Sequence, residues 1–192
     1  MSKPQLLVLA VLAIVVIGVG VFLYRGGSSL GMSQRVEFVG AATTTVYTLS
    51  GTTLSFVSAA PTKNHVLGTL PDGSLLELTP IGLSQVMADG TAVQLINAGG
   101  AGSTTPIGVA SSDLSVVAFE NMTIHRIVVY RFNPASQTST FIGSASLGAA
   151  IPKSVGLTGQ ALMVNSSDGA YYSLPILGDS VGAPIKLTLI TR

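Results

Sequence analysis

An uninterrupted apolar stretch, from Leu6 to Tyr24, constrains this chain more than any other feature of its sequence. Its nineteen residues include no charged side chain, no amide and no proline. As a helix rising about 1.5 Å per residue it would cover roughly 28 Å, close to the roughly 30 Å hydrocarbon core of a bilayer. A lone segment in lipid can satisfy its backbone hydrogen bonds only as a helix, so the stretch predicts a single transmembrane helix.

The length and flanks of this stretch indicate how it is processed and oriented. The apolar core of a cleaved signal peptide has about 7–15 residues, so nineteen favour an uncleaved signal anchor. Cleavage within the Gly/Ser stretch at residues 26–29 is the alternative. Lys3 before the span is balanced by Arg25 and Arg35 after it, but a five-residue tail can stay inside while a large domain is exported. We expect a cytoplasmic N-terminus and an extracytoplasmic domain, periplasmic or extracellular, at the plasma or inner membrane.

Small residues gather on one side of the predicted membrane helix. At about 100° per residue, Ala10, Ala13 and Gly20 share a face. Small side chains let a second helix approach closely, so these three are the candidate positions for helix packing. The alternative is that alanine and glycine simply occur in membrane helices.

The sequence divides into an anchor at residues 1–25, a Gly/Ser linker at 26–34 and a β-rich domain at 35–192. Charged residues make up 9% of the chain, against roughly 25% in typical soluble domains. The surface must therefore consist largely of hydroxyls, amides and small apolar groups. Such a surface suits a domain that packs into a larger assembly, because free proteins generally use charge to stay soluble.

Charge and cysteine content exclude several classes of function. The net charge is only +1, which argues against nucleic-acid binding. The absence of cysteine excludes disulfides, thiol catalysis and thiolate metal sites. The expected partners are the bilayer and other membrane-protein subunits, with a homo-oligomer as a further alternative.

Short β-type runs separated by turn residues fill the rest of the chain. They begin at Arg35 and continue to Ile190, they are dense in β-branched residues, and no segment between the turns has a convincing period of 3.6. Residues 81–87 are the one candidate for a helical turn. The fold class predicted from this pattern is all-β.

An internal comparison indicates repetition. Residues 68–78 align with 164–174 at an offset of 96, which matches Asp72-Gly73 with Asp168-Gly169, and the midpoint of 48 falls at Glu120-Asn121. Each unit would hold about four strands with a tight Asp-Gly-type hairpin in the middle. The expected first strands are residues 53–59, 105–111 and 152–158, and the expected last strands are 92–97, 139–144 and 184–190.

From Arg35 to Arg192 the chain thus resembles a β-propeller, whose blades are four-stranded repeats of about 40–50 residues. The resemblance carries no family signature, since tryptophan is absent, and it assigns no functional residue. Three units and a half-unit fall short of the roughly four blades that close a ring. The repeats could form an open stack that a neighbouring protein completes. The slightly favoured alternative is that the hairpins fold into an ordinary β-sandwich.

The ionisable residues give little basis for catalysis. Five of the eight acidic residues lie in turns, where short carboxylates bond to nearby backbone: Asp72, Asp89, Asp113, Asp168 and Asp179. The others, Glu37, Glu77 and Glu120, have no spacing that pairs two of them. His65 and His125 lack a second ligand at metal-binding spacing. We therefore expect a non-enzymatic protein with no catalytic residue, cofactor or metal site.

One strand and two sequons are candidate sites. The segment from His125 to Phe132 is the densest cationic and aromatic stretch, and it is a candidate interaction edge or a strand that faces lipid headgroups, with these residues as its candidates: Arg126, Tyr130, Arg131 and Phe132. The alternative, an ordinary strand with mixed faces, is favoured about twofold because cross-strand pairs stabilise any sheet. Asn121 and Asn165 begin sequons that fit a glycosylated exported domain.

Three functions fit these observations. The favoured one is a structural or accessory subunit of a membrane or cell-envelope complex, in which the β domain makes protein–protein contacts. The first alternative is a pilin-like or surface-layer filament subunit. The second is a membrane-tethered propeller that binds a ligand at its central channel.

Overall fold

The computed structural model describes residues 33–62, 65–99 and 104–190. These residues lie almost entirely within one compact unit, Gln34–Arg192. Throughout the described ranges the regular structure is β-strand, which confirms the all-β class. The predicted membrane stretch and its packing positions Ala10, Ala13 and Gly20 lie outside the described residues. Within the described ones no helix is long and apolar enough to cross a bilayer.

One large sheet closes on itself. Its order is β13-β12-β1-β2-β3-β16-β14-β15, and an additional pairing of β13 with β14 completes a ring. The pairs are antiparallel except β3 and β16, which run parallel where Thr53 faces Thr188. The strands are β1 (Gln34–Gly40), β2 (Thr43–Ser50), β3 (Thr53–Pro61), β12 (Pro152–Thr158), β13 (Ala161–Ser166), β14 (Tyr171–Leu177), β15 (Ser180–Val181) and β16 (Ile185–Ile190).

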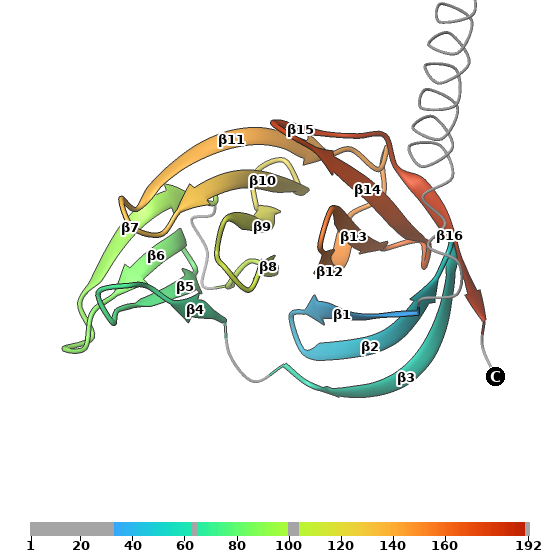
Figure 1. Ribbon diagram of the computed structural model, residues 1–192, viewed down its shortest axis with the longest axis horizontal. Coiled ribbons are helices and arrows are strands. Elements are labelled where there is room, and N and C mark those ends of the chain that lie inside the picture. Colours follow the sequence, from blue (N-terminus) through green and yellow to red (C-terminus); the bar gives the residue numbers. More distant parts are fainter. Residues whose placement is uncertain (1–32, 63–64, 100–103, 191–192) are drawn as a thin grey trace, which may run out of the picture. The chain divides into compact units, whose positions relative to one another are not determined.

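Two four-stranded antiparallel meanders make up the remainder (Figure 1). The β4–β7 sheet consists of β4 (Val66–Thr69), β5 (Leu75–Thr79), β6 (Gly82–Val86) and β7 (Ala92–Asn97). The β8–β11 sheet consists of β8 (Gly108–Ala110), β9 (Val116–Asn121), β10 (Arg126–Asn133) and β11 (Thr138–Ala145). Both sheets form from hairpins, because each strand pairs with the one before it.

The inner strands of the β8–β11 sheet, β9 and β10, are largely buried on both faces. Alternate residues of β9 and β10 point to opposite sides of the sheet, so one set packs against the closed sheet and the other against the β4–β7 sheet. Ala118 and Val129 belong to the first core, with Leu162 and Leu174 of the closed sheet. The second core unites Phe119 with Leu76, Leu78, Leu83 and Phe132. Burial on both sides explains the continuous apolar run at residues 116–119.

The Asp turns follow one local design. In the turns at Asp72, Asp89, Asp113 and Asp168, one carboxylate oxygen accepts the backbone N–H two residues later. The residue after each aspartate has a positive φ, and it is glycine in all but one case. Leu114, with φ 59°, is that exception. The prediction that these four aspartates shape turns is confirmed.

Acid should weaken these turns, most clearly at Asp113. Hydrogen bonds from the Ser111 hydroxyl, and then from Ser115, lower the pKa of Asp113 to about 2, against about 3.9 for an unfolded aspartate. A depressed pKa stabilises the fold above the unfolded value, and that contribution is lost as the pH falls from about 4 to about 2. We expect Asp113→Asn to be less stable than wild type at pH 6 and equally stable near pH 2. Urea unfolding at a series of pH values measures this, and a stability difference that does not change with pH would contradict it.

The predicted repeat is correct in part. The expected last strands coincide with β7, β11 and β16, and two expected first strands coincide with β8 and β12. The third, residues 53–59, was wrong: it is β3, the third strand of a β1–β3 meander. The offset of 96 was also wrong, because the Asp72 turn joins the first two strands of its sheet and the Asp168 turn joins β13 to β14. The structural counterpart of Asp72 is Asp113, between β8 and β9, 41 positions later.

Two further expectations are settled by the pairing pattern. The helical turn at residues 81–87 was wrong, because Gly82 closes a hairpin and β6 pairs with strands on both sides. The arrangement, a barrel-like closed sheet with two meanders packed in succession, is loosely consistent with propeller-like repeats. The predicted half-unit, residues 35–49, corresponds to β1 and β2. With β3 these strands form a three-stranded meander.

Candidate functional site

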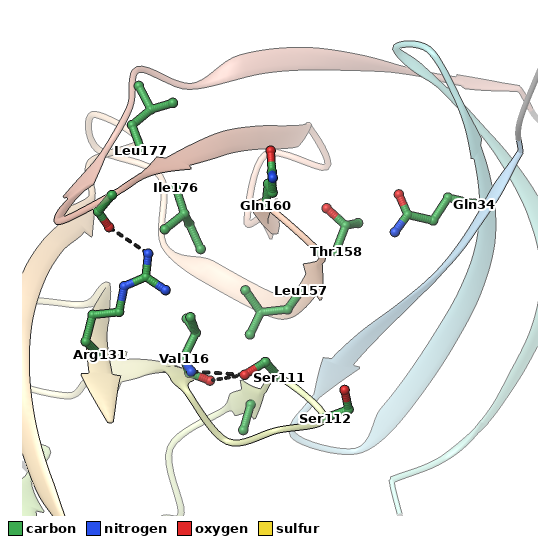
Figure 2. A pocket seen from close by; sticks show the side chains of 13 residues that line it. Gln34, Ser111, Ser112, Val116, Arg131, Leu157, Thr158, Gln160, Ile176 and Leu177 are labelled. Atoms are coloured by element: carbon green, nitrogen blue, oxygen red, sulfur yellow. Dashed lines mark hydrogen bonds between the residues drawn. The ribbon is translucent and has the colours of Figure 1, made fainter. Parts of the chain in front are cut away.

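A pocket of about 700 Å³ lies between the β8–β11 sheet and the closed sheet. This volume falls within the roughly 300–1,000 Å³ of small-molecule sites. Figure 2 shows the side chains of three separate chain regions around the hollow: the start of β1, the strands around β8 to β10, and the segment from β12 to the β14–β15 turn. The lining residues are Gln34, Ala110, Ser111, Ser112, Val116, Arg131, Leu157, Thr158, Gly159, Gln160, Ile176, Leu177 and Gly178.

Arg131 is the one charged residue in that lining. It lies in β10, opposite Val116 of β9 and Thr140 of β11. Its guanidinium spans the gap to the closed sheet, where Nη2 donates a hydrogen bond of 2.8 Å to the carbonyl oxygen of Gly178 (Figure 2). This bond fixes the guanidinium at the wall of the pocket and leaves other N–H donors, because arginine has five.

Neutral polar side chains provide most of the other hydrogen-bonding groups. The hydroxyl of Ser111 is committed locally, since it donates to Asp113 at 2.6 Å and accepts the Val116 N–H at 3.0 Å. Thr158 donates to the Ala161 carbonyl at 3.3 Å. The amides of Gln34 and Gln160 and the hydroxyl of Ser112 line the pocket too (Figure 2).

The pocket lining combines one cation with neutral polar and apolar groups. A general acid or base must lie within hydrogen-bond reach of the reacting group, and no carboxylate or imidazole belongs to the lining. Asp113 lies next to it, but its carboxylate is held by Ser111 and Ser115. In the described part of the chain, no three acidic or histidine side chains gather where they could hold a metal ion.

A second, smaller hollow of about 310 Å³ lies among β1, β4, β8 and β12. It shares Ala110 and Leu157 with the larger pocket. Glu37 is its one charged lining residue, and that carboxylate accepts a hydrogen bond of 3.0 Å from Arg35. The other side chains of its lining are apolar.

Comparison with known proteins gives no family. No family model matches the chain, and no curated protein matches it. Among solved structures it is similar to a periplasmic gluconolactonase of Pseudomonas aeruginosa, at 14% identity and a TM-score of 0.47. The similarity covers 79% of this chain and 53% of the other, so this chain spans about half the length of that protein. A likeness at this level identifies neither a family nor an activity.

The predicted interaction strand is an internal strand. β10 pairs with β9 on one side and β11 on the other, so it is not an edge. Phe132 is 4% exposed within a core, and Tyr130 stacks on Phe119 with ring centroids 5.7 Å apart. Arg126 is exposed at the start of the strand. Of the four residues proposed from the sequence, Arg131 alone lines the pocket.

The other residues considered from the sequence are scattered. Asn121 accepts hydrogen bonds from the backbone of Thr123 and Ile124, and Asn165 lies in β13; glycosylation at either stays a prediction. Glu120, nearly buried, lies 3.3 Å from Nδ1 of His125. No signal in the sequence brought Gln34, Ser112, Thr158 and Gln160 together, because they are common polar residues from distant segments.

Three strands with an edge that is wholly or partly unpaired in the described part of the chain, β3, β7 and β11, form a second feature of functional interest. β3, β7 and β11 contain no Asp, Glu, Lys or Arg, as is true of seven other strands; the charged strand residues lie in β1, β5, β9, β10, β12 and β16. Within the described ranges, β7 pairs only with β6 and β11 only with β10. β3 has a second ladder partner only at residues 53–55. Each of the three strands also exposes a large apolar side chain: Val57 at 53%, Val93 at 46% and Phe141 at 56%.

Proposed function

We propose that this protein is a non-enzymatic structural or accessory subunit of a larger membrane or cell-envelope complex. Its β domain contacts partner proteins through the outer strands β3, β7 and β11, and its apolar N-terminal stretch places it at the membrane. The observation that supports this most directly is the absence of charge on those three strands.

An open strand edge is a template for pairing with another chain. Natural proteins guard such edges with lysine and other charged side chains, with proline, with bulges or by covering them. Here β3, β7 and β11 carry no charge, and each has one bulged residue against its partner strand. Pro61 lies at the end of β3. Edges protected by a single bulge and by no charge still present backbone N–H and C=O groups, and strands or side chains of partners are their natural cover. Edge pairing also gives affinity through backbone hydrogen bonds without any catalytic group.

The site chemistry agrees with a contact function. Four aspartates are committed to turns, Glu37 to Arg35 and Glu120 to His125, and the pocket lining has neither an acid nor a base. Binding and assembly remain as the functions that these residues support.

Charging the open edges should release the partners. We expect Val57→Lys and Val93→Lys, combined in the full-length chain, to lower recovery of co-purifying membrane proteins at least about tenfold, because a buried unpaired ammonium weakens an apolar contact strongly. The measurement is mild-detergent capture of the native protein, with quantitative mass spectrometry of its companions.

The combination of Ala135→Lys and Ser136→Lys is the matched control, since it adds the same two charges at exposed positions in the β10–β11 turn. It should leave recovery unchanged. Wild-type protein that always runs alone as a monomer would contradict the proposal. Equal recovery with the edge variant and with the control would contradict it as well.

A further inference from the structure

We propose that the pocket between the β8–β11 sheet and the closed sheet binds a small monocarboxylate that also bears hydroxyl or amide groups. Arg131 would receive the carboxylate, and Gln34, Ser112 and Gln160 would bind the neutral polar groups. This site is separate from the outer strands and does not depend on their role in assembly.

The charge in the pocket has no counter-ion within the described part of the chain. The ion pairs there are Arg35 with Glu37 and His125 with Glu120, and neither involves Arg131. Among the described residues, the Arg131 guanidinium donates one hydrogen bond, to the neutral carbonyl oxygen of Gly178. A guanidinium presents its donors in a planar fork that matches a carboxylate, and charge-assisted bonds of this kind are about twice as strong as neutral ones. The pocket therefore attracts an anion.

The charge count limits that anion to one negative charge. Arg131 is the single cation among the thirteen lining residues. A phosphate monoester carries about −1.5 to −2 at neutral pH and would remain under-neutralised here. A carboxylate carries −1 and matches the site.

The neutral groups indicate what else the ligand contains. The side chains of Gln34, Ser112 and Gln160 make no hydrogen bond to any described residue, so their donors and acceptors are available. Amides and hydroxyls both donate and accept, as a ligand's hydroxyl or amide groups require. Leu157 and Ile176 are apolar side chains of the lining that would contact the carbon skeleton.

Matched acid and amide probes test this site. The probes are N-acetyl-alanyl-alanine and its C-terminal amide, and glycerate and glyceramide, added to the purified full-length chain. Saturation-transfer NMR should detect binding of an acid and not of its amide. Arg131→Gln should weaken that binding at least about tenfold, the size expected for losing a charged hydrogen-bond partner.

Arg126→Gln is the matched control, because it removes the same charge from an exposed position on the same strand. It should bind the acids as wild type does, and Gln160→Ala should weaken them by a smaller factor. The proposal is overturned if neither acid shows carboxylate-dependent binding. Equal binding of acid and amide, or equal losses in the Arg131 and Arg126 variants, would overturn it too. Unchanged unfolding of Arg131→Gln in urea shows that a loss of binding is local.

Discussion

Replacing Phe38 with alanine is expected to lower the free energy of unfolding by about 3–5 kcal/mol. Phe38 lies in β1 and is fully buried inside the closed sheet. Its ring makes edge contacts with Tyr47 of β2 and Tyr171 of β14, at centroid distances of 5.5 and 5.2 Å. The phenyl ring thus joins two strands that are not neighbours in the sheet, and its loss leaves a cavity where they meet.

The two tyrosines make the site costly to rearrange. Their hydroxyl oxygens lie 2.7 Å apart and share a hydrogen bond, and burial together with that bond raises the pKa of Tyr171. If the rings shifted to fill the cavity left by Phe38, this bond would be strained or broken. Cavities that cannot collapse give the larger losses among core substitutions.

Equilibrium unfolding in urea, followed by circular dichroism, measures the change. Phe141→Ala is the matched control, because Phe141 is 56% exposed and contacts Tyr130 at the surface of the β8–β11 sheet. That variant should lose less than about 1.5 kcal/mol. Similar losses in the two variants would show that the closed sheet has no tightly packed interior.

Local chemistry allowed the hairpins to be predicted. The Asp-Gly turns and the strands β7, β10, β11 and β16 depend on a few neighbouring residues, so the sequence indicates them directly. The error at β3 arose because the prediction used only neighbouring residues. Nothing in residues 53–59 reveals that they complete the meander begun by β1 and β2, or that residues 53–55 also pair in parallel with β16, more than 130 positions later.

The candidate site was harder to predict for the same physical reason. Arg131 is conspicuous in the sequence because charge is scarce, but its surroundings come from residues as distant as Gln34 and Gly178. Strand alternation correctly separates Arg131 from Tyr130 and Phe132, which belong to the opposite face. Alternation alone does not say that the pocket lies on one face and a core on the other.

The close approach of β1 to β12 depends on Gly156. A Cβ atom at this position would lie 2.3 Å from the carbonyl oxygen of Glu37 and 3.4 Å from a methyl of Val36. The Glu37 backbone is also tied to β2, where Glu37 pairs with Val46. It cannot move without disturbing that ladder, so a methyl group here must push the two strands apart.

We therefore expect Gly156→Ala to cost about 3 kcal/mol or more, at the upper end of overpacking effects. Gly159→Ala is the control: its Cβ would meet nothing within 4 Å, so the change should be within about 1 kcal/mol and can be stabilising. Urea unfolding gives both values, and amide exchange at Val39 and Val155, which pair across β1 and β12, locates the damage. If Gly156→Ala unfolds like Gly159→Ala and keeps those amides protected, the two strands lie farther apart than the structure has them. In that case β1 and β12 would not form the close contact that holds the closed sheet and the β12 wall of the pocket in place.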